Sequence, residues 1–370
     1  MPLKILIAPD KFKGTLTAQQ AAEAIARGWR SVRPDDALEL LPMSDGGDGF
    51  GEIISNLLGA TPQSTPTVNA AGESIQGPWW WHEPSHTAIV ESARIIGLAM
   101  LPRDRFHPHD LDTRGLGEIL QAAARRGARR CIVGIGGSAT NDGGFGLARA
   151  LGWQFLNRHD EDITRWIDLP SLANIRPPQT TRLFTEIIVA VDVQNPLLGP
   201  NGCSRVYGPQ KGLTDFDIAD RALGRLAEVA AAWLRIDHAN TPGAGAAGGL
   251  GFGLMTFCGA RMEPGIDIFE RHSELTRRVK GSNLVLTGEG ALDAQTLMGK
   301  GVGEIATVCQ REGVPCIGLA GVVPEPEKAK TKFTAAYSLT PGLTDKQSAL
   351  NEPAVWLERL AAKVAADWRG

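Results

Sequence analysis

The segment at residues 4–17, which reads KILIAPDKFKGTLT, decides the fold class. It begins with the short, mostly apolar run Lys4–Ala8, and such runs are typical of a buried strand. A charged loop with one glycine follows. Thr17 stands three residues before Gln20, and this capping-box spacing predicts that a helix begins directly after Thr17. Strand, loop and helix in this order form one unit of an α/β protein with a parallel sheet.

The alternation of strand and helix recurs along the chain and predicts mainly parallel sheets with helices on both faces. Further strands are expected at Leu38–Leu41, Cys131–Ile135, Glu186–Val191, Leu284–Thr287 and Pro315–Leu319. A chain of 370 residues is longer than one hydrophobic core usually organises. We therefore predict one domain built from both chain ends, residues 1–66 and 283–370, and a second, inserted α/β domain, residues 67–282. Within the insert, the polar segment Asn157–Arg182 predicts a long surface connection.

The composition is that of an ordinary globular protein, with 43% apolar residues, 21% charged residues and a net charge of −3. This balance gives no electrostatic reason to expect nucleic acid or an anionic membrane as a partner. The five cysteines lack C-x-x-C spacing, which indicates reduced thiols and not a disulfide framework or zinc site. The uncharged stretch Pro242–Ala260 contains seven glycines, which argues against a membrane span. We expect a soluble, cytoplasmic protein.

Charged loops, most of them rich in glycine, follow several of the predicted strands. They lie at Ala8–Thr15, Pro42–Gly49, Gly134–Gly144, Asp192–Pro196 and Gly288–Thr296. Because ligands bind outside the carboxyl ends of parallel strands, we expect these loops to form one site. Backbone N–H groups of such loops approach phosphate oxygens, while carboxylates hold Mg²⁺ or accept a proton. Lysines can neutralise the charge on a transferring phosphoryl group.

Each loop alone also has an ordinary structural explanation. Gly-Gly and Asp-Gly pairs mark tight turns more often than phosphate sites. Asp10 and Asp142 precede predicted helices, where a lone Asp often acts as a cap, and Lys211 and Lys300 taken singly resemble solvated lysines. The recurrence of such loops at five strand ends favours a functional site, because structure alone does not require it.

Two other interpretations have weaker support. Gly134-x-Gly136-x-x-Ala139 with the later Asp160 resembles a dinucleotide fingerprint, but no second strand clearly delivers Asp160. The Trp79–Trp81 run could stack bases, yet residues of a strand alternate faces and no basic residues interleave, which favours a role in a sheet. The Walker A, protein-kinase, nucleophile-elbow and H-E-x-x-H motifs are absent from the sequence.

Taken together, the glycine-rich blocks closely resemble those of the type-1 glycerate kinase family, including its bacterial glycerate 2-kinases. The matching blocks are Ala8–Gly14, Pro42–Gly49, Gly134–Gly144, Tyr207–Gly212, Pro242–Gly249, Pro264–Asp267 and Thr287–Gly290. So many long blocks in the right order are specific, unlike a lone motif. The departures are small: the family often has Ala at Ser44, Glu at Asp48 and Arg at Ala291, and the last difference thins the positive charge near Asp293.

The resemblance implies a flavodoxin/Rossmann-like three-layer domain with a second α/β domain inserted. It also implies ATP- and Mg²⁺-dependent phosphorylation of D-glycerate in glycerate or glyoxylate catabolism. Bacterial members generally make 2-phosphoglycerate, so we expect the 2-hydroxyl to be the acceptor; a 3-kinase, or a kinase of a related small hydroxy acid, is the alternative. An NAD-dependent oxidoreductase and a non-enzymatic glycerate sensor are more distant alternatives. The oligomeric state stays open, with a homo-oligomer among the options.

We expect the catalytic groups on the strand-end loops. Asp192 is the first candidate for the general base, because it follows a buried strand and leads into an Asn-Pro turn. Asp45 is the second, as a metal ligand or alternative base. Glu289 and Asp293 are candidates for Mg²⁺. The candidates for binding substrate or phosphate are Asp10, Lys13, Ser138, Asn141, Lys211 and Lys300.

Overall fold

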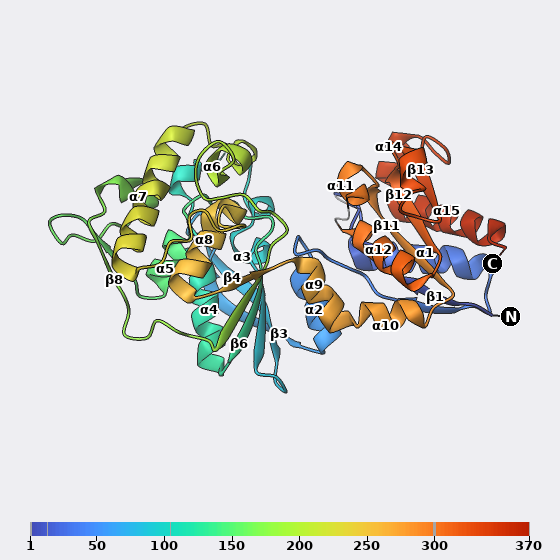
Figure 1. The fold of residues 1–370 in the computed structure, drawn as a ribbon, viewed down its shortest axis with the longest axis horizontal. Coiled ribbons are helices and arrows are strands. Elements are labelled where there is room, and N and C mark those ends of the chain that lie inside the picture. Colours follow the sequence, from blue (N-terminus) through green and yellow to red (C-terminus); the bar gives the residue numbers. More distant parts are fainter. Residues whose placement is uncertain (1, 13, 104, 299–300, 370) are drawn as a thin grey trace. The chain divides into compact units, whose positions relative to one another are not determined.

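A computed structural model describes residues 2–12, 14–103, 105–298 and 301–369. The chain forms two compact units, Met1–Asp45 with Ile266–Gly370, and Gly46–Gly265. The first unit thus contains both ends of the chain, coloured blue and red in Figure 1. The prediction of an α/β fold from both chain ends, with an α/β insert, is confirmed. Among the described residues, no helix combines the length and apolar character that a bilayer crossing requires.

The first unit contains a parallel five-stranded sheet in the order β13-β12-β11-β1-β2. Ile5 of β1 pairs with Leu38 on one side and Leu284 on the other, so distant parts of the chain meet at β1. The strands are β1 (Lys4–Ile7), β2 (Ala37–Leu40), β11 (Leu284–Ala291), β12 (Cys316–Val322) and β13 (Ala335–Thr340). The helices are α1 (Ala18–Val32), α10 (Leu275–Lys280), α11 (Ala294–Leu297), α12 (Val302–Glu312), α13 (Pro326–Ala329), α14 (Lys346–Asn351) and α15 (Pro353–Asp367).

The core of the first unit follows from the alternation of its strands. Ile5 and Ile7 point to the face that α1 and α15 cover, where they join one apolar core with Trp29. The predicted start of α1 is confirmed: the Thr17 hydroxyl accepts from the Gln20 N–H at 3.1 Å, and Gln20 Oε1 accepts from the Thr17 N–H at 2.9 Å.

The second unit contains a mixed six-stranded sheet in the order β10-β9-β6-β5-β4-β3, and β7 pairs with β8 separately. From β5 to β10 the neighbours are parallel, whereas β3, β4 and β5 are antiparallel. The strands are β3 (Thr61–Val68), β4 (Ser74–His82), β5 (Thr87–Glu91), β6 (Arg130–Gly134), β7 (Gln154–Leu156), β8 (Asn174–Arg176), β9 (Glu186–Ala190) and β10 (Arg261–Glu263). The helices are α2 (Phe50–Leu58), α3 (Ala93–Ile96), α4 (Arg114–Arg126), α5 (Phe145–Ala150), α6 (Cys203–Tyr207), α7 (Phe216–Leu234) and α8 (Ala246–Cys258); α9 (Gly265–Ser273) begins at the boundary.

Both faces of the larger sheet are covered. Trp79 and Trp81 are buried in the core beneath α4, α5 and α8, on the face that Figure 1 shows carrying those helices. Trp80 is buried outside that core. The tryptophan run is therefore part of the sheet, as its alternation predicts.

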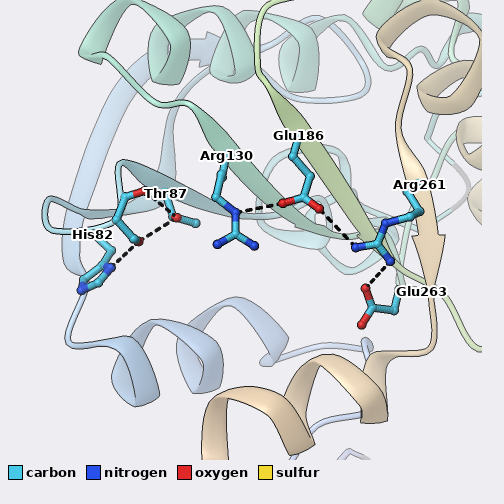
Figure 2. Close-up of polar contacts among 7 residues, drawn as sticks. His82, Thr87, Arg130, Glu186, Arg261 and Glu263 are labelled. Carbon is cyan, nitrogen blue, oxygen red and sulfur yellow. Dashed lines mark hydrogen bonds and ion pairs between the residues drawn. The ribbon is translucent and has the colours of Figure 1, made fainter.

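A ladder of ion pairs holds the short edge strand β10 against its neighbours (Figure 2). Arg130 pairs with Glu186 at 2.9 Å, Glu186 with Arg261 at 3.2 Å, and Arg261 with Glu263 at 2.7 Å. The Arg130–Glu186 and Glu186–Arg261 pairs are partly exposed and add little stability singly. The first joins β6 to β9, and the second joins β9 to β10, the strand that leads the chain to Gly265.

The compact units divide after Asp45 and Gly265, whereas the sequence-based boundaries lie near residues 66 and 282. The reason lies in α2, which belongs to the second unit. The buried Glu91 at the end of β5 accepts from the Gly49 N–H at 2.8 Å and the Gly51 N–H at 3.1 Å, and so caps the start of α2.

Candidate active site

Three strand ends of the first unit bring carboxylates together. The Asp10 N–H after β1 donates to the Gly288 carbonyl of β11 at 2.9 Å, and the Met43 N–H after β2 donates to the Pro9 carbonyl at 2.9 Å. These bonds fix the loops of Asp10 and Asp45 beside Glu289, which lies near the carboxyl end of β11. This edge is where ligands bind in open α/β sheets.

Glu289 is at the centre of this acidic edge. Burial is the largest cause that raises its pKa, to about 7, and the charges of Asp10, Asp293 and Asp45 raise it further. The Thr296 hydroxyl donates to Glu289 Oε1 at 2.6 Å and opposes the shift. Four carboxylates therefore interact here, and a bound cation would relieve their repulsion.

The amino end of α12 lies at the same edge. A Cβ on Gly301, which precedes α12, would be 3.9 Å from Asp10 Oδ2 and 4.0 Å from Asp45 Oδ2. The positive end of a helix dipole favours negative charge at this position, from a carboxylate or from a phosphate. Asp293 has a structural function as well, because its Oδ1 accepts from the Gln295 N–H at 2.8 Å and caps α11.

The acidic edge fits Mg²⁺ in the type of its donors. Within the described part of the chain, no three His, Cys, Asp or Glu residues are grouped so that they could hold a metal ion by themselves. Mg²⁺ usually keeps several waters and binds through one or two carboxylates and the phosphates of a substrate. The arrangement suits an ion shared with a nucleotide, and not a closed protein cage.

In the second unit, the loop after β6 packs against the glycine-rich start of α8. Residues 247–249 form a left-handed turn, in which Ala247 has φ +55°. The Ser138 hydroxyl donates to the Ala247 carbonyl at 3.4 Å, and the Gly143 N–H donates to the Gly248 carbonyl at 3.1 Å. A Cβ on Gly248 would lie 1.9 Å from the Thr140 carbonyl oxygen, so only glycine allows this approach.

Lys211 and Asn141 lie inside this double loop. Lys211 is only 7% exposed, and its ammonium donates to the Thr140 carbonyl at 2.6 Å. Burial lowers its pKa from 10.5 to about 8. The buried Asn141 amide donates to the Ser204 hydroxyl at 3.1 Å, while its Oδ1 has no hydrogen-bond partner among the described residues. Both side chains therefore help to fix the loop from within.

Asp192 follows β9, the strand beside β6, and its Oδ1 accepts from the Gly265 N–H at 3.0 Å. Because Gly134 pairs with Ala190, the β6 loop and Asp192 leave the same sheet edge. Asp142, in contrast, is a structural cap. Its buried carboxylate accepts from the Thr113 hydroxyl and from the N–H groups of residues 113, 144 and 146.

The predicted site residues are thus gathered in two groups. Asp10, Asp45, Glu289 and Asp293 share the acidic edge of the first unit, while Ser138, Asn141, Lys211 and Asp192 share the β6–β9 edge of the second. Lys13 and Lys300 lie outside the described residues. The exposed Asp160 lies between the antiparallel strands β7 and β8 and pairs with Arg176, so it does not have the setting that a dinucleotide fingerprint requires.

Sequence reasoning assigned no function to three residues that complete these edges. Thr296 and Glu91 act through the hydrogen bonds given above. Asp48 approaches the β6 loop, where its Oδ1 lies 2.6 Å from the position of a Cβ on Gly137. For Asp48, the only signal in the sequence was the repeated Asp-Gly pattern of its loop, and nothing in the sequence singled out Thr296.

Comparison with known proteins identifies the family. A profile described as the Glycerate kinase family matches residues 5–369. A glycerate kinase of Bacillus subtilis (strain 168) is 38% identical over 371 residues, which cover 98% of this chain and 97% of that protein. A glycerate 2-kinase of Escherichia coli (strain K12) is 37% identical over 328 residues, covering 86% and 85%.

A solved structure agrees with these matches. The crystal structure of a Salmonella typhimurium LT2 protein, described as a glycerate kinase 2, superposes with a TM-score of 0.85 at 34% identity and covers 99% of this chain and 98% of its own. The chain therefore belongs to the glycerate kinase family and is a phosphotransferase that acts on a small-molecule substrate with a nucleotide.

Proposed function

We propose that the protein transfers the γ-phosphoryl group of ATP, with Mg²⁺, to the 2-hydroxyl of D-glycerate and yields 2-phosphoglycerate and ADP. The observation that carries this proposal is the cluster of four carboxylates around Glu289 at the carboxyl edge of a parallel sheet. Such a cluster is costly unless a cation binds there, and phosphoryl transfer needs that cation beside the phosphates. The reaction would belong to glycerate or glyoxylate catabolism.

In this proposal the first unit handles the nucleotide and its metal. Glu289, with Asp293 or Asp45 as a second carboxylate, would hold Mg²⁺, which neutralises charge on the phosphates when it is bound. Asp10 lies beside the amino end of α12, where backbone N–H groups can receive a phosphate oxygen. In the sequence, Lys13 follows Asp10 in the loop at Ala8–Thr15, and Lys300 directly precedes Gly301. Both lysines would add positive charge near the phosphates.

The second unit supplies the groups for the acceptor. Asp192 would accept the proton of the 2-hydroxyl as that oxygen attacks the γ-phosphorus, while the Gly265 N–H keeps its carboxylate oriented. Ser138 and Asn141 hold the β6 loop next to it. Lys211 would support the binding of the anionic substrate chiefly by fixing this loop, because its side chain is buried and its ammonium donates to the Thr140 carbonyl.

The choice of the 2-hydroxyl draws its support from the name of the Escherichia coli relative, glycerate 2-kinase. The test is a coupled ADP-release assay over D-glycerate, L-glycerate, glycolate and lactate, with ³¹P NMR of the product. We expect turnover with D-glycerate and a signal that matches 2-phosphoglycerate. A 3-phosphoglycerate signal would overturn the regiochemistry, and faster turnover with another hydroxy acid would overturn the substrate.

A further inference from the structure

We propose that Thr296 is a positioning residue that orients the Glu289 carboxylate for the metal–nucleotide complex; this inference rests on the proposed function. The Thr296 side chain is buried, and its hydroxyl donates to Glu289 Oε1 at 2.6 Å. The Ala291 carbonyl lies farther away, at 3.5 Å. Because a hydroxyl has one proton to donate, the short bond to the carboxylate takes it.

Thr296 is itself held by its neighbours. Its N–H donates to Asp293 Oδ1 at 3.4 Å, within the α11 cap. On the other side, α12 presses against its backbone, since a Cβ on Gly303 would lie 1.9 Å from the Thr296 carbonyl oxygen. Gly303 therefore lets the first turn of α12 reach Thr296. The hydroxyl is fixed relative to β11, α11 and α12, and this gives the bonded carboxylate a defined direction.

The hydrogen bond also matters because of the charges around it. The carboxylates of Asp10, Asp45 and Asp293 lie at the same edge as Glu289. A carboxylate that accepts a short hydroxyl bond at one oxygen is held in one orientation, and carboxylate oxygens are the ligands that a hard cation needs. Groups that hydrogen-bond to a metal ligand, without touching the metal themselves, typically contribute roughly 10- to 100-fold to metal affinity.

The experiment compares the magnesium dependence of ADP binding in matched variants of the full chain, by isothermal titration calorimetry with and without Mg²⁺. Thr296→Val keeps the shape but removes the hydroxyl, whereas Thr296→Ser keeps the hydroxyl. Thr307→Val is the control, because it removes a threonine hydroxyl that donates to the Gly303 carbonyl at 3.0 Å, within α12 itself.

We expect Thr296→Val to lose roughly tenfold of the gain in ADP affinity that Mg²⁺ confers. Thr296→Ser and Thr307→Val should keep the wild-type gain. In the kinase assay, Thr296→Val should need more Mg²⁺ for half-maximal activity, with kcat recovering when Mg²⁺ is saturating. A merely structural hydroxyl would lower the melting temperature without changing this dependence.

A Thr296→Val protein with the wild-type magnesium gain would overturn the proposal. If Thr296→Val does not fold, Thr296→Ala serves the same comparison with a smaller side chain, and the same two outcomes apply. Failure of the proposed function is a separate result: the wild type would then release no ADP with any hydroxy acid, although calorimetry still reports whether Thr296 governs the magnesium gain.

Discussion

The acidic edge of the first unit and the β6–β9 edge of the second occupy the same place in their folds, beyond the carboxyl ends of parallel strands, yet they are built differently. The first gathers carboxylates that raise the pKa of Glu289. The second interlocks two glycine-rich loops around a buried lysine. One edge concentrates unbalanced negative charge and the other concentrates close backbone contacts.

The difference indicates a division of labour. Repulsion among carboxylates is a cost that a cation removes, so we propose the acidic edge as the place of the metal and its nucleotide. In the second unit the buried carboxylate of Asp142 is satisfied within the protein by four donors. There the loops act as a rigid support, and Asp192 is the carboxylate that we assign to the chemistry.

The largest effect that we expect is on turnover in Asp192→Asn. Loss of a general base lowers kcat by roughly 10²–10⁴-fold, while the asparagine oxygen can still accept from the Gly265 N–H and preserve the fold. Steady-state kinetics measure the loss of kcat, and a melting curve measures whether the fold is preserved. Asp345→Asn, at an exposed helix cap, is the control and should turn over normally. Near-normal turnover in Asp192→Asn would contradict the assignment of Asp192 as the general base.

Gly248→Ala should destabilise the second unit by roughly 1–3 kcal/mol through steric overpacking, because its Cβ would lie 1.9 Å from the Thr140 oxygen. Gly259→Ala is the matched control, with a similar positive φ but no neighbouring atom within 4 Å. Urea unfolding of both variants separates the clash from backbone strain. Equal losses of stability in Gly248→Ala and Gly259→Ala would mean that the loop of Thr140 can move away from residue 248 at no cost.

Lys211 gives a prediction for pH. Its pKa is lowered from 10.5 to about 8, so the unfolded chain binds more protons between these values and stability rises with pH there. The wild type should therefore gain stability relative to Lys211→Met as pH rises from about 8 to 10.5. Denaturant unfolding across this range measures the difference, with Lys363→Met, exposed on α15, as the control. Parallel curves for wild type and Lys211→Met would contradict a buried, depressed lysine.

The smallest effect concerns Ala247, the alanine of the left-handed turn. Ala247→Gly should stabilise the protein by about 0.5–1 kcal/mol, because glycine adopts a positive φ without steric cost. The same change at Ala124, inside α4, should destabilise instead. A loss of stability in Ala247→Gly would show that the methyl group packs usefully against its surroundings.

Local patterns predicted much of the fold. The capping box at Thr17 and the strand at Lys4–Ala8 both depend on neighbours in sequence, and both are confirmed. The surface connection predicted at Asn157–Arg182 is confirmed only in part. Most of its residues are exposed, but the segment contains a short 3-10 helix at Trp166–Ser171 and the strand β8, and it buries Trp166, because a few apolar residues among polar ones are enough to anchor it to the core.

The candidate site was predictable as loops but not as contacts. The strand-end rule indicated Asp10, Asp45 and Glu289 together, since it needs only the order of strands and loops. The sequence left open whether Asp142 is a cap, and it could not show that Thr296 bonds Glu289, because these contacts form only in the folded chain. Lys211 likewise has no local signal for burial.

The most direct test of this division of labour is the ADP affinity of Glu289→Gln and Asp192→Asn, each measured with and without Mg²⁺. The account predicts that Mg²⁺ strengthens ADP binding to wild type and Asp192→Asn but not to Glu289→Gln. An undiminished magnesium effect in Glu289→Gln would contradict it and move the metal–nucleotide site away from the acidic edge.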